Sequence, residues 1–223
     1  MAKQKQEEPE DSTQQQQKTT TNLYDYDKAV EWVEKKGKEQ YGKHFKIHEE
    51  DKPLLRKLLC YFLGDATIAS QFGISFNKGI LLTGPVGCGK TTLIALMRFF
   101  QQPQDRFILK SCRDVSFEFI QGGYETIHKY SRHSFRNHEP QSYCFDDLGT
   151  ENNLKYFGNE CNVMAEVLLS RYDLFVSRKL LTHLTTNLSA SEIEEQYGNR
   201  VRSRFREMFN LIAFDKQSKD KRK

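Results

Sequence analysis

A glycine-rich loop of nine residues, GPVGCGKTT, is the part of the sequence whose residue types and spacing could most directly do chemistry. It fits the phosphate-binding pattern GxxxxGK[ST]. Glycines let the backbone wrap around phosphate oxygens, so that successive N–H groups point at the anion. The lysine would add positive charge at the β- and γ-phosphates, and the following threonine would ligate Mg²⁺. The residues predicted to bind a nucleotide are Gly84, Pro85, Val86, Gly87, Cys88, Gly89, Lys90, Thr91 and Thr92.

Two adjacent acids, Asp146 and Asp147, follow an apolar stretch in YCFDDLGTE. A phosphate-loop ATPase needs one carboxylate to hold Mg²⁺ and a second acidic group to polarise the attacking water. We assign Asp146, with Thr91, to the metal and Asp147 to the water; Glu151 is a second candidate for the water. A solvated strand end is the alternative interpretation of the two acids. Their position after the phosphate loop favours the ATPase interpretation.

Polar and basic residues in the last third of the chain could serve the nucleotide site in two further ways. The stretch LTTNL ends an apolar run, and its Asn187 could hydrogen-bond the γ-phosphate and the water together; helix capping is the alternative. In YGNRVRSRFREMF, Arg200 and Arg204 share one helix face, while Arg202 and Arg206 share another. An arginine reaching a neighbouring subunit's nucleotide would neutralise charge in the transition state. Contact with nucleic-acid phosphates and a solvated helix face are the alternatives.

These residues need a sheet that brings distant strand ends together. Apolar runs predict strands at 79–83, 107–109, 142–145, 180–186 and 210–214. Helical spacing predicts helices at 24–41, 53–63, 93–100, 121–130 and 163–172. Strands that alternate with helices predict an α/β fold with a parallel sheet.

Length and composition divide the chain into four expected parts. We expect a disordered Gln-rich tail at 1–22, a short helical docking segment at 23–50, an ATPase core at 51–215 and a basic tail at 216–223. The formal charge of +4 is too small to identify a nucleic-acid binder. No apolar run approaches the roughly 18 residues needed to span a membrane. We therefore expect a cytoplasmic protein with no membrane partner.

The four motifs, in this order, resemble the AAA+ ATPases of the DnaC/IstB type, a group of helicase loaders and transposase helpers. The resemblance covers residues from about 45 to 214. It implies a P-loop NTPase fold of the AAA+ type, with a five-stranded parallel sheet and flanking helices. It also implies ATP and Mg²⁺ bound at a subunit interface, and a homo-oligomer that assembles with ATP on DNA, which we expect to be single-stranded. The resemblance assigns Lys90 and Thr91 to Walker A, Asp146 and Asp147 to Walker B, Asn187 to sensor 1, and Arg204, or else Arg200, to the arginine finger.

Two departures from this family leave the biological role open. Only residues 215–223 follow the fifth predicted strand, so we expect no C-terminal lid domain. The region before the core is shorter than a typical helicase-binding domain, so a replicative helicase in DNA replication and a transposase in transposition are both candidate partners. For adenine contact, the candidate segment is Phe45–Ile47. A P-loop small-molecule or nucleoside kinase, and a nucleotide-gated binding module with little hydrolysis, are the alternative functions.

Overall fold

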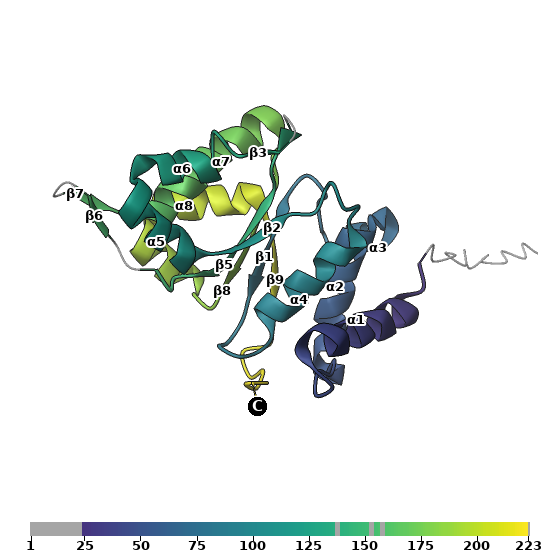
Figure 1. Cartoon of the computed structure of the whole chain (residues 1–223). Coiled ribbons are helices and arrows are strands. Elements are labelled where there is room, and N and C mark those ends of the chain that lie inside the picture. The colour runs from purple at the N-terminus through teal and green to yellow at the C-terminus, as the bar shows by residue number, and fades with distance from the viewer. Residues whose placement is uncertain (1–23, 137–138, 152–153, 157–158, 223) are drawn as a thin grey trace, which may run out of the picture.

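Five parallel strands form the central sheet, in the order β2-β5-β8-β1-β9 (Figure 1). The computed structural model describes residues 24–136, 139–151, 154–156 and 159–222. The sheet strands are β1 (Gly79–Thr83), β2 (Ile108–Ser111), β5 (Tyr143–Leu148), β8 (Thr182–Thr186) and β9 (Phe209–Ala213). This sheet confirms the predicted α/β class and the five parallel strands.

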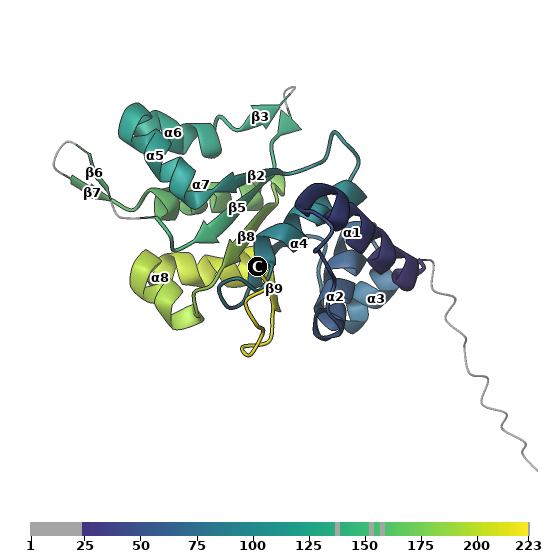
Figure 2. The same ribbon diagram turned by 60° about the horizontal axis from the view of Figure 1, so that its bottom comes forward.

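Helices cover both faces of the sheet (Figures 1 and 2). One face carries α1 (Tyr26–Tyr41), α2 (Lys52–Leu63), α3 (Ala66–Gln71) and α4 (Lys90–Met97). The other carries α5 (Cys112–Gly122), α6 (Tyr124–Tyr130), α7 (Val163–Arg178) and α8 (Ala190–Met208). Short elements complete the described chain: the 3-10 turns η1 (Glu49–Asp51) and η2 (Arg98–Phe100), and the antiparallel pairs β3 (Phe135–Arg136) with β4 (Glu139–Pro140) and β6 (Leu154–Tyr156) with β7 (Asn159–Cys161).

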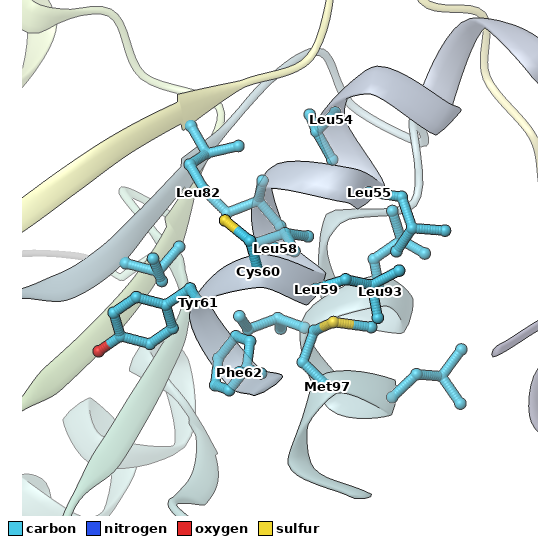
Figure 3. Close-up of a cluster of buried hydrophobic side chains, with 14 of the residues drawn as sticks. Leu54, Leu55, Leu58, Leu59, Cys60, Tyr61, Phe62, Leu82, Leu93 and Met97 are labelled. Carbon is cyan, nitrogen blue, oxygen red and sulfur yellow. The ribbon is translucent and has the colours of Figure 1, made fainter. Parts of the chain in front are cut away.

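Successive side chains of β1 point to opposite faces of the sheet and so belong to two separate hydrophobic clusters. Ile80 and Leu82 belong to the cluster under α1–α4, whereas Leu81 belongs to the cluster under α5–α8. Figure 3 shows α2 side chains gathered with Leu82 and with Leu93 and Met97 of α4. Each fully buried leucine of this kind contributes about 1.5–3 kcal/mol to folding. This packing fixes the first turns of α4, and with them the end of the phosphate loop.

Several element boundaries differ from the sequence prediction. Helix α5 was not predicted, and the predicted helix at 121–130 is divided at Gly123, which has a φ of 52°. The sequence of α5, CRDVSFEFIQG, contains residues of low helix propensity, so tertiary packing and the Ser111 cap stabilise it. Strand β5 continues through both acids, and α8 is interrupted at Gly198, where φ is 83°.

The N-terminal helix is packed on the same core as strand β1. Asp25 caps α1 by accepting a hydrogen bond from the backbone N–H of Lys28 at 3.1 Å. Val33 is fully buried, and Trp32 packs edge-on against Phe99 and Phe100, which follow α4. The docking role of this segment stays a prediction, and the predicted tail at 1–22 lies outside the described residues. None of the helices described here has the length and apolar composition needed to cross a membrane.

Candidate functional site

The glycine-rich loop connects β1 to α4 in the strand–loop–helix geometry that phosphate binding requires. Gly87 and Gly89 have φ values of 79° and 102°, a region that a side chain strongly disfavours. Gly89 is also the N-cap of α4, so that the unpaired N–H groups of the first helical turn face the loop. The loop thus has the backbone of an anion cradle.

Lys90 is held at the centre of this cradle by the loop itself. Its ammonium donates hydrogen bonds to the carbonyl oxygens of Gly84 and Pro85, each at 2.9 Å. The residue is only 5% exposed, so its charge lies within the loop and not in bulk solvent. This placement suits a lysine that neutralises phosphate charge.

A hollow of about 260 Å³ beside the loop brings three predicted catalytic residues together, Lys90, Asp147 and Asn187. We call it the phosphate-loop hollow, and its described lining is Val86, Gly87, Gly89, Lys90, Thr91, Thr92, Asp147, Thr150, Asn187 and Arg222. The residues converge because β8 lies between β1 and β5, so the carboxyl ends of these strands meet at one sheet edge. Asn187 is exposed there, and the helix cap is Ser189 instead, since its side chain accepts from the Glu192 N–H.

Asp146 and Thr91 form the predicted metal-binding pair. The Thr91 hydroxyl lies 3.0 Å from both carboxylate oxygens of Asp146, and the Thr185 hydroxyl donates to Oδ1 of the same carboxylate at 2.6 Å. Burial raises the pKa of Asp146, and the hydrogen bond from Thr185 opposes that shift. A hydroxyl and a carboxylate are hard oxygen ligands, so the donor set fits Mg²⁺. Thr185 has no predicted role from the sequence, where its one signal is the polar pair that ends β8.

Asp147 is aimed into the hollow by an irregular backbone. The pairing register of β5 and β8 shifts between Phe145 and Leu148, and Asp147 has a φ of 55°, in the left-handed region. Its N–H donates to the Thr185 hydroxyl at 2.9 Å, and its carbonyl oxygen accepts from the Thr150 hydroxyl at 2.7 Å. The surrounding bonds therefore hold a conformation that an aspartate alone would disfavour.

Glu151 connects the loop after β5 with α8. Its carboxylate accepts from the Gly149 N–H at 3.0 Å and from the Tyr197 hydroxyl. Burial, reinforced by the nearby Glu151 carboxylate, raises the pKa of Tyr197. These contacts fit a residue that fixes the loop, and the role of Glu151 in polarising water stays a prediction.

The two candidate finger arginines lie in the part of α8 that follows Gly198. The Arg204 guanidinium lies 4.7 Å from the Tyr172 ring centre and donates to the Arg200 carbonyl oxygen at 3.2 Å. Arg200 is exposed. Neither residue belongs to the described lining of the phosphate-loop hollow. An arginine that serves a neighbouring subunit must lie away from its own site, so both assignments stay predictions.

A second hollow, of about 590 Å³, adjoins the first. We call it the Phe45 hollow, and its described lining is Tyr41, His44, Phe45, Lys46, Ile47, His48, Asp51, Gly87, Cys88, Gly89, Thr92, Leu93, Lys221 and Arg222. Its volume is that of a small-ligand site. The Ile47 N–H donates to Glu34 of α1 at 3.0 Å, which anchors the segment predicted to contact adenine.

Comparisons with solved structures confirm the fold class. The crystal structure of the DnaC helicase loader has a TM-score of 0.52 and 19% sequence identity, covering 76% of this chain and 92% of that one. A candidate primosome component from Streptococcus pyogenes serotype M3 has a TM-score of 0.53 and 18% identity, covering 77% of this chain and 83% of that one. The chain therefore shares the fold of these two proteins, a five-stranded parallel sheet with flanking helices, as the resemblance in its motifs implied.

Sequence comparisons give shorter matches. No protein-family model matches the chain. The Fe(3+) ions import ATP-binding protein FbpC of Photobacterium profundum is 35% identical over 75 residues, which are 33% of this chain. FetA of Escherichia coli, an ATP-binding protein assigned to iron export, is 37% identical over 71 residues, 30% of this chain. The matched stretches span 21% and 32% of those two proteins, so the similarity is local.

Proposed function

We propose that this protein is a Mg²⁺-dependent ATPase that assembles with ATP into a homo-oligomer on single-stranded DNA. One observation carries the ATPase proposal: Lys90, Asp147 and Asn187 line one hollow together with Thr91, whose hydroxyl contacts Asp146. ATP hydrolysis requires a lysine, a metal-binding pair, a second acid and a polar side chain at the end of a neighbouring strand. The two curated proteins with local similarity are both named for ATP binding, which supports this choice of nucleotide.

Each residue has a defined task in the proposed reaction. Lys90 and the loop N–H groups bind the β- and γ-phosphates, and Mg²⁺ held by Thr91 and Asp146 would neutralise charge on the phosphates. Asp147 accepts the proton of the attacking water, while Asn187 orients that water against the γ-phosphate. The Phe45 hollow takes the base, since it adjoins the phosphate-loop hollow and has the volume for a ligand.

The oligomer and DNA proposals rest on α8 and on the fold. Arg204, or else Arg200, would complete the site of a neighbouring subunit. The fold shared with the DnaC helicase loader supports a role in replication, with a helicase as partner; a transposase is the other candidate. The helical segment at 23–50 would be the docking element for that partner, and the protein would act in the cytoplasm.

Rates of ATP hydrolysis, with and without single-stranded DNA, test the proposal. Lys90→Ala should abolish turnover, and Arg204→Ala should reduce it roughly a thousandfold. Arg206→Ala is the matched control, because Arg206 is an exposed arginine on another face of the same helix. Particle size should increase with ATP in the wild type and not in Lys90→Ala.

Mixing experiments test whether the site is shared. Lys90→Ala subunits still supply an arginine, and Arg204→Ala subunits still supply a phosphate loop, so a mixture should recover part of the activity. A mixture that stays inactive while Arg204→Ala still assembles would contradict an interface site. Phosphate transferred to a small acceptor, with none released to water, would identify a kinase instead.

A further inference from the structure

The C-terminal segment Asp220–Arg222 is anchored to the phosphate loop (Figure 2). The Lys221 N–H donates to the Gly87 carbonyl oxygen at 3.0 Å, and the Lys221 ammonium donates to the Cys88 carbonyl oxygen at 3.1 Å. The same ammonium forms an ion pair with Asp51, a buried carboxylate 170 positions earlier in the chain. Lys221 thus joins the loop to the start of α2 and closes one side of the Phe45 hollow.

The residues on either side of this anchor form a pair of their own. The Asp220 carboxylate packs on Gly87, where an added Cβ would lie 2.1 Å from Oδ1. It accepts from the Arg222 side chain, through Nε at 3.1 Å and Nη2 at 2.8 Å. The Arg222 side chain is 68% exposed, so its guanidinium is accessible to a ligand.

The hydrogen bonds of the segment leave the anion cradle accessible. Those described between Lys221 and the loop end on carbonyl oxygens, whereas the N–H groups of a phosphate loop are the groups that face the anion. The described hydrogen bonds of Lys221 therefore use none of the loop N–H groups. This arrangement favours a segment that adds to a nucleotide site over one that blocks it.

We propose that Arg222 binds the α- and β-phosphates of the nucleotide and that Lys221 is the positioning residue that holds it there. The inference rests on the proposed nucleotide site. Arg222 lines both hollows, together with Gly87, Gly89 and Thr92, so it lies at their junction. A nucleotide with its base in the Phe45 hollow and its γ-phosphate at Lys90 has its α- and β-phosphates at that junction. The guanidinium then exchanges Asp220 for phosphate oxygens, which it can bind in a bidentate manner.

Equilibrium binding of a fluorescent ATP analogue and of the corresponding ADP analogue tests the proposal. Arg222→Gln should weaken both by roughly ten- to hundredfold, the range for hydrogen bonds to charged groups. Lys219→Gln removes a charge from the same segment and should leave both affinities, measured without DNA, unchanged. Lys221→Met should weaken binding as Arg222→Gln does, and Lys221→Arg should restore most of it; thermal melting of each variant checks that the fold is intact.

The outcomes separate this inference from the proposed function. If the wild type binds neither analogue, the nucleotide site itself is wrong. If Lys90→Ala loses binding while Arg222→Gln binds as the wild type does, the site stands and the role of Arg222 is refuted. Tighter binding by Arg222→Gln would mean that the segment blocks the site. Weaker binding of the ATP analogue alone would mean that the arginine contacts the γ-phosphate. Either result overturns the proposal.

Discussion

Replacing Thr185 by valine should damage both stability and catalysis, although Thr185 is not assigned to touch a nucleotide. Its hydroxyl is fully buried, donates to Asp146 at 2.6 Å and accepts from the Asp147 N–H at 2.9 Å. Valine has nearly the same shape, so the change removes both hydrogen bonds with little effect on packing. One hydroxyl therefore sets the positions of the acid proposed to bind the metal and of the acid proposed to polarise the water.

The two lost bonds set the expected magnitude. A hydrogen bond to a charged group contributes about 1.5–3 kcal/mol, and an unpaired buried N–H costs about 1–3 kcal/mol. Because the two effects share one atom and are not independent, we expect the free energy of unfolding to fall by about 3 kcal/mol. Turnover should fall on the order of a hundredfold, because displacing one catalytic group by about 1 Å can have that effect.

Urea unfolding and steady-state ATP hydrolysis measure the two effects. Thr185→Ser keeps the hydroxyl and is the matched control, for which we expect turnover near that of the wild type. A Thr185→Val variant whose unfolding free energy lies within about 0.5 kcal/mol of the wild type, the range of neutral surface changes, would refute the bridging role. Normal turnover in a destabilised variant would show that the hydroxyl supports the fold alone.

Three further predictions test other parts of the structure. Asp147→Asn keeps the shape of the side chain and should retain ATP binding while turnover falls about a hundredfold or more, whereas an equal loss in Glu151→Gln would assign the water to Glu151. Gly37→Ala would ordinarily stabilise a helix, but its Cβ would lie 2.1 Å from the Phe45 ring, so we expect a lower melting temperature and weaker nucleotide binding. Burial lowers the pKa of His183 to about 3 from 6.5, so the folded state does not take up the proton that the unfolded state binds. The free energy of unfolding should therefore be unaffected by this group above about pH 7 and fall by several kcal/mol as the pH decreases from 6.5 toward 3, and His183→Gln should make urea-unfolding profiles less steep over that range.

The strands and most of the site could be predicted from the sequence because their signals are local. Strand β1 is buried on both faces, so GILLT appears as an apolar run, and the loop that follows has a fixed spacing of glycines. Parallel strands end at one sheet edge, which is why Asp147 and Asn187 could be placed together from the sequence. The helix predicted at 163–172 is longer in the structure, where α7 continues to Arg178.

The remaining site residues depend on contacts that no local pattern contains. Thr185 acts on Asp146 only because the register of β5 and β8 places their ends side by side, and that register is set by the whole sheet. The contact between Lys221 and Asp51 joins positions 170 residues apart. In the sequence, a basic residue near the chain end is equally compatible with a solvated tail. The role of Lys221 follows only from its contacts with Asp51 and the phosphate loop in the folded chain.

The contacts of Glu151 connect the loop after the two acids to the part of α8 that carries the candidate finger arginines. The N–H of Gly149, in the loop after the acids, donates a hydrogen bond to Glu151. Glu151 also accepts from the hydroxyl of Tyr197, which lies directly before the break in α8 at Gly198. The helical segment after that break carries Arg200 and Arg204. A shift of the acid loop between nucleotide states would therefore be transmitted through one hydrogen-bonded path to the arginines. If so, Tyr197→Phe should reduce ATP-dependent assembly more than it reduces nucleotide affinity, and equal losses in the two measurements would contradict this coupling.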